Sequence, residues 1–140
     1  MKQIFVVFLL LVGISTLQAQ QGEKALITET LMKYIEGSTN GKPDLLKEAF
    51  HPDLNLYYVR KGEFRVWSGK DYILDTKEGQ PTGEMGRILS IDYENNAAVA
   101  KVEIKDPKSE GPPYIDYFML LKVEGKWIIV HKMFTKKTSK

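Results

Sequence analysis

Cysteine is absent from the 140-residue sequence, and histidine is scarce, with only His51 and His131. Without cysteine the chain has no disulfide framework, and a lipid-modified bacterial lipoprotein is excluded because its lipid is attached to a cysteine. No His-x-x-x-His motif or carboxylate cluster accompanies the two histidines. The sequence therefore predicts no tetrahedral zinc site and no other metal centre.

A basic excess is also missing, since Lys and Arg number 20, Asp and Glu number 18, and the formal net charge is +2. Proteins that follow phosphate backbones carry strongly basic surfaces, so no nucleic-acid partner is predicted. The stretch "GQPTGEMG" lacks the lysine and the following helix of a phosphate-binding loop, and no Gly-x-Ser-x-Gly elbow occurs. These absences leave no predicted cofactor.

The N-terminal stretch "MKQIFVVFLLLVGISTLQAQQ" is typical of a secretory signal peptide. It has one lysine, an apolar run from Ile4 to Ile14, and small or polar residues up to Ala19. The run is too short to span about 30 Å of hydrocarbon as a permanent anchor. We expect residues 1–19 to be removed, with cleavage after Ala19 or after Gln20. The mature protein is then periplasmic or secreted and has no membrane anchor.

The remaining chain of about 120 residues is the size of one domain, which can bury roughly two-thirds of its unfolded surface. We expect this domain over residues 20–136 and a frayed basic tail over 137–140. Residues 23–36 carry apolar side chains at i, i+4, i+7 and i+8, the spacing of one helical face. The side chains of this stripe are Ile27, Leu31, Tyr34 and Ile35.

Two shorter helices are predicted after the first. Pro43 suits the first turn of a helix that ends near Pro52, which places His51 at the helix C-terminus. His51 with Asp53 is open to two interpretations: a metal or catalytic pair, or a histidine that contacts the terminal carbonyls or closes the pocket mouth. The stretch "SGKD" predicts a capping box that opens a third helix running to Asp75.

The second half of the chain changes to an apolar period of two, which is typical of strands. One strand pair flanks Glu94-Asn95-Asn96, another flanks Glu124-Gly125, and an earlier pair, "LNLYYVR" and "EFRVW", flanks Lys61-Gly62. Helices followed by long antiparallel strands predict an α+β domain in which the helices cover one face of a curved sheet.

The last hairpin, "YIDYFMLLKVEGKWIIVHKMF", holds the main candidate site. If Glu124-Gly125 form a two-residue turn, Phe118 lies opposite His131, and Asp116 is a diagonal neighbour of His131 on the same face. Such a pair at the rim of an apolar cavity is a tunable acid/base pair. The alternative is that His131 only satisfies Asp116 at the end of the sheet.

The opposite face of this hairpin is also apolar. With Trp127 and Ile129 on the core side, the other side presents Met119, Leu121, Ile128 and Val130. A flat apolar surface of this kind is suited to association between two copies of the chain. We therefore expect a homodimer through the outer sheet face.

The motifs "EAFHPD", "WSGKDYI" and "YFMLLKVEGKWIIVHKMF" together resemble the nuclear-transport-factor-2-like superfamily, in particular small bacterial proteins filed as lumazine-binding or polyketide-cyclase-like. The resemblance covers nearly all of the mature chain. It implies N-terminal helices packed on a strongly curved, mostly antiparallel sheet that forms a cone with an internal pocket. Enzymes of the superfamily use an Asp or an Asp–His pair on the inner sheet surface, and Asp116 with His131 match those positions.

The function that we expect is binding of a small apolar or aromatic molecule. An alternative is an enzyme of the dehydratase, isomerase or cyclase type with Asp116 and His131 as its acid/base pair. A third possibility is a structural partner-binding domain with a filled core. The residues predicted to line the pocket are Tyr34, Phe50, His51, Leu56, Tyr58, Trp67, Tyr72, Phe118, Leu120, Trp127 and Ile129.

Overall fold

The computed structural model describes residues 22–138, so the predicted signal peptide lies outside the described residues. A helix over residues 22–39, called the N-terminal helix below, comes first. The elements that follow are α2 (Pro43–Ala49), β1 (Phe50–Arg60), β2 (Glu63–Ser68), α3 (Gly69–Asp75), β3 (Met85–Glu94), β4 (Ala97–Lys105), β5 (Tyr114–Val123) and β6 (Lys126–Lys136).

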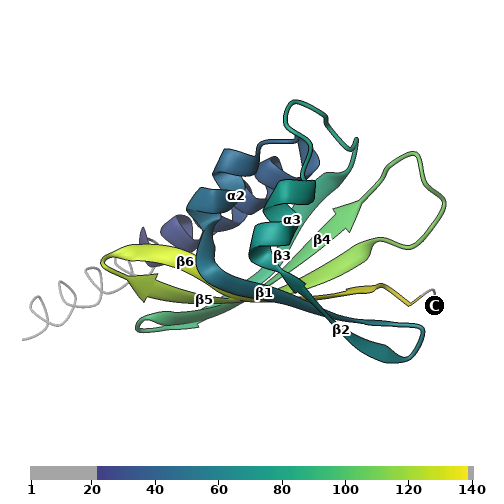
Figure 1. Ribbon diagram of the computed structural model, residues 1–140. Helices are drawn as coiled ribbons and strands as arrows, with labels where there is room; N and C mark the ends of the chain where they lie inside the picture. The colour runs from purple at the N-terminus through teal and green to yellow at the C-terminus, as the bar shows by residue number, and fades with distance from the viewer. Residues whose placement is uncertain (1–21, 139–140) are drawn as a thin grey trace, which may run out of the picture.

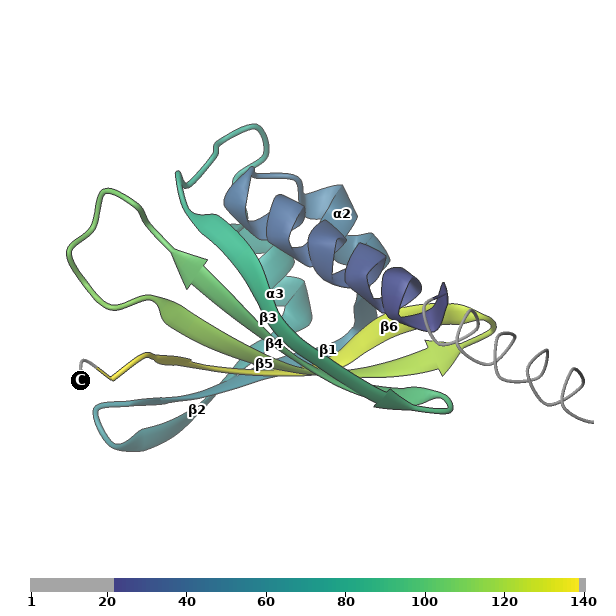
Figure 2. The same cartoon turned by 180° about the vertical axis from the view of Figure 1, so that it is seen from behind.

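The strands form one six-stranded sheet in the order β2-β1-β6-β5-β4-β3. All neighbours are antiparallel except β1 and β6, which run parallel. The helices lie on one face of the sheet, and the sheet curls around them (Figure 1). The view from behind shows the N-terminal helix crossing the same face (Figure 2). The predicted α+β architecture is confirmed.

The three predicted hairpin turns form as expected. Lys61, Asn95 and Glu124 have φ angles of 54°, 51° and 49°, and Gly62 and Gly125 both have φ of 80°. At Lys61-Gly62 and Glu124-Gly125 two consecutive residues have positive φ, which gives the turn a twist that matches the twist of the flanking strands. Each turn therefore sets the pairing register of the two strands that it joins.

The N-terminal helix packs through its predicted apolar stripe, which is buried. It approaches β3 so closely that a Cβ atom on Gly86 would lie 2.4 Å from Ile35 Cγ2. At its start, Glu23 accepts hydrogen bonds from Lys122 Nζ at 2.5 Å and from Trp127 Nε1 at 2.8 Å. The last hairpin is thus tied to the first helix. Among residues 22–138 no helix is both long and apolar enough to cross a membrane.

The second helix is shorter than predicted. It ends at Ala49, and Phe50 already has extended geometry with φ −97° and ψ 139°. Phe50 is buried and pairs with Ile129 in the parallel β1–β6 ladder. Tertiary pairing therefore wins over the helical pattern, and His51 lies in β1, not at a helix C-terminus. The third helix begins as predicted, because the Ser68 side chain accepts a hydrogen bond from the Asp71 amide.

Candidate functional site

The register of the β5–β6 hairpin places the candidate site. From the turn to Leu120–Ile129 the pairing follows the prediction, but then a β-bulge adds one residue to β6. Beyond it Met119 lies opposite His131 and Phe118 lies opposite Lys132. Because side chains alternate between faces, one extra residue exchanges the two faces of β6 from this point onward.

The predicted neighbourhood of Asp116 and His131 is therefore wrong. Asp116 is buried on the inner face, where it lies opposite Phe134. His131 lies on the outer face, and its ring stacks on Tyr57 with centroids 4.5 Å apart and planes at 14°. The two side chains point to opposite sides of the sheet, so they do not form an acid/base pair.

Lys132 takes the place that His131 was predicted to fill. Its ammonium Nζ lies 3.1 Å from Asp116 Oδ2, with side-chain exposures of 5% for Lys132 and 3% for Asp116. Lys132 Nζ also donates to the Tyr34 hydroxyl at 2.6 Å, and that hydroxyl donates to Asp116 Oδ2 at 2.6 Å. We call these three side chains the inner cluster. It joins the N-terminal helix to β5 and β6.

Aromatic rings surround the ammonium of the inner cluster. Lys132 Nζ lies 4.6 Å from the ring centre of Tyr34, 5.2 Å from those of Tyr72 and Phe134, and 5.8 Å from that of Phe118. An ammonium within about 6 Å of a ring face is attracted by the ring quadrupole. The rings replace part of the solvation that Lys132 loses inside the sheet.

The electrostatics of the cluster keep Tyr34 protonated. Burial raises the pKa of the Tyr34 hydroxyl well above its ordinary value, and the neighbouring Tyr72 and Asp116 raise this pKa further. A buried ion pair loses several kcal/mol of hydration per ion, and only good geometry with further hydrogen bonds offsets that loss. Within the described chain no buried side-chain nitrogen or oxygen lacks a hydrogen-bond partner. The cluster is therefore satisfied internally.

A pocket of about 410 Å³ opens beside the inner cluster. Tyr34 lines it, so one side chain belongs to both the cluster and the pocket wall. The other lining residues come from the N-terminal helix, β2, α3, the loop after α3 and β4: they are Ser38, Trp67, Tyr72, Asp75, Thr76, Lys77, Gln80, Pro81, Thr82, Glu84 and Ile104. The pocket thus has an aromatic side and a polar rim.

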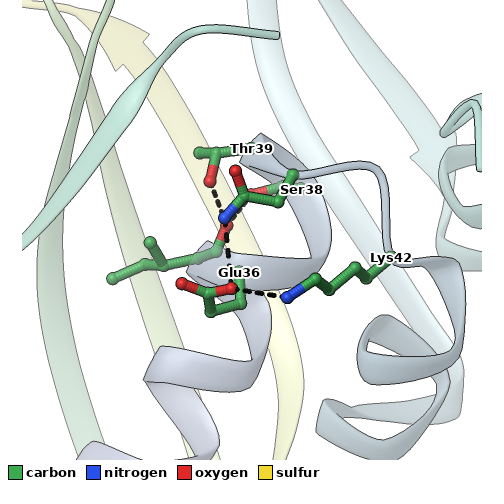
Figure 3. A network of polar contacts seen from close by, with 6 residues as sticks. Glu36, Ser38, Thr39 and Lys42 are labelled. Carbon is green, nitrogen blue, oxygen red and sulfur yellow. Dashed lines mark hydrogen bonds and ion pairs between the residues drawn. The ribbon is translucent and has the colours of Figure 1, made fainter. Parts of the chain in front are cut away.

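The end of the N-terminal helix supports one wall of this pocket, to which Ser38 belongs. Thr39 Oγ1 donates to the Ile35 carbonyl at 2.8 Å, and Glu36 accepts from Lys42 at 3.0 Å (Figure 3). The loop after α3 is fastened to the same region, because the Thr82 amide donates to the Thr39 carbonyl at 2.8 Å. The Gly79 amide donates to the Gly41 carbonyl at 2.9 Å. The loop is held by backbone hydrogen bonds, which fixes the pocket mouth.

The predicted pocket residues divide into three groups. Tyr34, Trp67 and Tyr72 line the pocket. Phe50 and Phe118 lie one layer away, in ring contact with Tyr34. The remaining apolar residues are part of the buried core or packed beside it: Leu56, Leu120, Trp127 and Ile129 are buried, and Tyr58 stacks on Phe134.

His51 lies away from the pocket. Its Nδ1 accepts a hydrogen bond from the Asp53 amide at 3.1 Å, and the side chain is partly exposed. This local contact explains the spacing of "HPD" without a bound metal. Among residues 22–138 no group of three His, Asp or Glu side chains is placed to hold a metal ion.

The sequence reasoning missed Lys132, Asp75 and Glu84. The apolar surroundings of Lys132 in "KWIIVHKMF" were visible, but an unbulged strand puts this lysine on the outer face. Asp75 and Glu84 lie in or beside a loop, where the sequence carries no periodic signal. Only the folded chain brings them to one pocket.

The outer face of the sheet carries exposed apolar side chains. Met119 is 51% exposed and Leu121 is 42% exposed, whereas Ile128 and Val130 are half-buried. Phe64, whose ring stacks on that of Tyr57, is also exposed on the outer face. The other exposed apolar residues of this face are Val66, Val99, Tyr117 and Met133. A shallow hollow of about 330 Å³ lies on this face between β3, β4, β5 and β6.

The comparisons with known proteins agree with the fold of this chain. A family model described as "Putative lumazine-binding" matches residues 22–135. An NTF2-like protein of unknown function from Shewanella baltica is 29% identical with a TM-score of 0.71, and the match covers 84% of this chain and 96% of that chain. One from Methylobacillus flagellatus is 28% identical with a TM-score of 0.71, covering 84% and 94%.

A curated protein is also similar to this chain. "Aldolase FrzH" from a Cladobotryum species is 28% identical over 111 residues, which are 77% of this chain and 86% of that protein. The solved structures confirm the predicted resemblance in fold.

Proposed function

We propose that this chain, which belongs to the family described as putative lumazine-binding and has the NTF2-like fold, binds a small molecule in the pocket beside the inner cluster. The observation that carries the proposal is Tyr34, which lines the pocket and bonds to both buried charges. A concave site with an apolar aromatic side and a few polar groups is the usual form of a small-molecule site.

The volume and the walls support a compact, planar ligand. A pocket of about 410 Å³ lies within the range of ligand sites, which is roughly 300–1,000 Å³. Trp67 and Tyr72 meet edge to face, with ring centres 5.0 Å apart. Aromatic rings favour a flat ligand through stacking and burial. This open volume also favours a binding role over the third possibility, a structural domain with a filled core.

Titration with lumazine, the molecule in the family description, tests the proposal through tryptophan fluorescence. The chain has two tryptophans, and Trp67 lines the pocket while Trp127 is buried beside Glu23. We expect saturable quenching that Trp67→Phe largely removes. Trp127→Phe is the matched control, and this variant should retain the quenching by lumazine. Quenching that Trp67→Phe leaves unchanged would place the binding elsewhere and contradict the proposal.

A second candidate is an enzyme that uses the same pocket for acid/base chemistry on a carbonyl compound. The supporting observation is the buried set of titratable groups next to the pocket, since such sets gather at active sites. The similarity to an aldolase points the same way. In this candidate Asp116 is the base, Tyr34 passes the proton, and Lys132 stabilises negative charge. These roles replace the predicted acid/base pair of Asp116 with His131. Dehydratase, isomerase or cyclase chemistry also requires a positioned acid and base.

Turnover separates the two candidates. With a hydroxy ketone as the probe, an enzyme should accelerate carbon–carbon cleavage or hydrogen exchange beside the carbonyl, and Asp116→Asn should abolish this activity. A protein that only binds should give no acceleration over buffer.

Export and association complete the proposal. The N-terminal pattern of residues 1–19 supports a signal peptide, and hence a periplasmic or secreted mature protein. The exposed apolar side chains of the outer face, among them Met119, Leu121 and Met133, support a homodimer through that face, because contiguous apolar patches on soluble proteins mark interaction sites.

A further inference from the structure

We infer that the ligand of the pocket is an organic cation, an ammonium group on a small apolar body, with the ammonium over Trp67 and beside Asp75 and Glu84. This inference rests on the proposed function and adds the charge class of the ligand. Three observations carry it: the ring of Trp67, which contacts no cation of the described chain, the rim carboxylates, which have no ion-pair partner there, and the neutral interior.

The aromatic side of the pocket is suited to a positive charge. The rings of Tyr34 and Tyr72 already hold an ammonium of the protein itself, that of Lys132, at 4.6 Å and 5.2 Å. Trp67 is not among the rings that Lys132 contacts, and its one ring partner in the described chain is Tyr72. Indole is the strongest cation partner among the aromatic side chains. Trp67 therefore offers a ring to a second cation.

The rim of the pocket supplies the opposite charge. Asp75 and Glu84 line the pocket, and neither carboxylate has an ion-pair partner within residues 22–138. Lys77 is the one cationic side chain in the lining, and it too forms no ion pair there. Two carboxylates against one ammonium leave the lining with a net negative charge. A cationic ligand would pair with these carboxylates, whereas an anion would be repelled.

The buried charges of the inner cluster do not cancel the preference of the rim for a cation. Lys132 contacts Tyr34 and Tyr72, which line the pocket, but its charge is offset by Asp116 at 3.1 Å. Opposite charges so close together act on a ligand in the pocket as a dipole, whose field falls off faster than that of a single charge. The charge that a ligand meets is therefore mainly that of the rim.

Three probes of one size test the inference: benzylamine, which is protonated at neutral pH, benzyl alcohol, which is neutral, and benzoate. Their dissociation constants are measured by calorimetry on the mature protein. We expect benzylamine to bind about tenfold more tightly than benzyl alcohol, and benzoate to bind most weakly. Equal affinities, or a preference for benzoate, would overturn the inference.

Charge variants locate the effect. Glu84→Gln and Asp75→Asn should each weaken benzylamine about threefold to tenfold and leave benzyl alcohol unchanged. Lys77→Met should tighten benzylamine. Asp92→Asn is the matched control, because Asp92 lies in the hollow on the outer face of the sheet, and it should change nothing. Variants of Asp75 and Glu84 that bind benzylamine as the parent does would overturn the inference.

The outcomes separate this inference from the proposed function. Suppose that benzyl alcohol binds as tightly as benzylamine and that Trp67→Leu abolishes the binding of both. This result would support the pocket as the binding site and overturn only the preference for a cation. Failure of all three probes would overturn the cation inference, while the lumazine titration judges the pocket independently.

Discussion

Lys132 lies opposite Phe118 in the β5–β6 ladder, and its ammonium approaches the Asp116 carboxylate to 3.1 Å inside the sheet. The bulge after Ile129 is the cause, because in an unbulged strand of the same sequence Lys132 would lie on the outer face and His131 on the inner face. A local irregularity of one strand therefore determines which charges the interior contains.

The first prediction concerns this ion pair. Lys132→Met leaves Asp116 buried without its cation, which should lower the free energy of unfolding by about 3–5 kcal/mol. Urea denaturation followed by circular dichroism measures the loss.

A cluster replacement serves as its control. Removing all three polar groups together, with Tyr34→Phe, Asp116→Leu and Lys132→Met, leaves no buried group without a partner and should recover most of the lost stability. A triple variant as unstable as the single one would show that packing, not the unpaired charge, causes the loss.

The second prediction concerns alkaline pH. In the folded chain the pKa of the Tyr34 hydroxyl lies above the ordinary tyrosine value of 10.0. Below that pH both the folded and the unfolded state keep the proton. Above it only the unfolded state releases it, so the stability from this group is lost as pH rises beyond about 10. The unfolding free energy of Tyr34→Phe should fall less steeply from about pH 9 to pH 11. Tyr117→Phe, at an exposed position, should keep the parent slope.

The third prediction concerns the pocket mouth. Gly41 has φ of 62°, and a Cβ there would lie 2.4 Å from the Lys77 carbonyl oxygen. Gly41→Ala should displace the loop after α3, lower stability by more than the roughly 1–2 kcal/mol of left-handed backbone strain, and weaken lumazine binding.

Gly79 provides the matched control for this change. Its φ is 69°, but a Cβ at Gly79 would meet nothing within 4 Å. Gly79→Ala should therefore cost only the backbone strain. If the two alanine variants lose equal stability and bind lumazine equally, the contact between Gly41 and the loop does not shape the pocket.

The fourth prediction concerns association. Met119 is 51% exposed on the outer face, so a charge placed there should not disturb the core. Met119→Glu should give a folded monomer if the outer face forms the dimer interface, because the charge would be buried unpaired between two copies. Analytical ultracentrifugation at micromolar concentration measures the state. A parent protein that is already monomeric would contradict the dimer.

The fifth prediction concerns export. Processing should remove residues 1–19 or 1–20 and leave Gln20 or Gln21, respectively, as the first residue. The intact mass of protein from a secretion-competent host measures this, and a retained Met1 would contradict a cleaved signal peptide.

The sequence predicted the architecture well because its determinants are local. The apolar stripe through Ile27, Leu31 and Tyr34 identified the first helix, and Glu124-Gly125 identified the turn of the last hairpin. The core side of that hairpin near the turn, with Leu120 opposite Ile129, was also predicted correctly.

The site was predicted only in part, because a bulge leaves no mark in an apolar strand. The residues "IIVHK" fit a regular strand and a bulged strand equally well, and only packing against Tyr34 and the surrounding rings selects the arrangement with Lys132 inside. Asp116 was assigned to the inner face correctly, but its partner was not. Long-range packing decides such a choice, and it cannot be seen from spacing along one strand.

The bulge in β6 also has a consequence for the evolution of this site. Deletion of the single codon for Val130 makes β6 a regular strand, in which His131 still lies opposite Met119 on the outer face and Lys132 still lies opposite Phe118 on the inner face. One mutational event therefore removes the local bend of the strand and leaves the buried amine in place. Relatives that lack one residue at this point are expected to keep the same inner polar groups and the same fold.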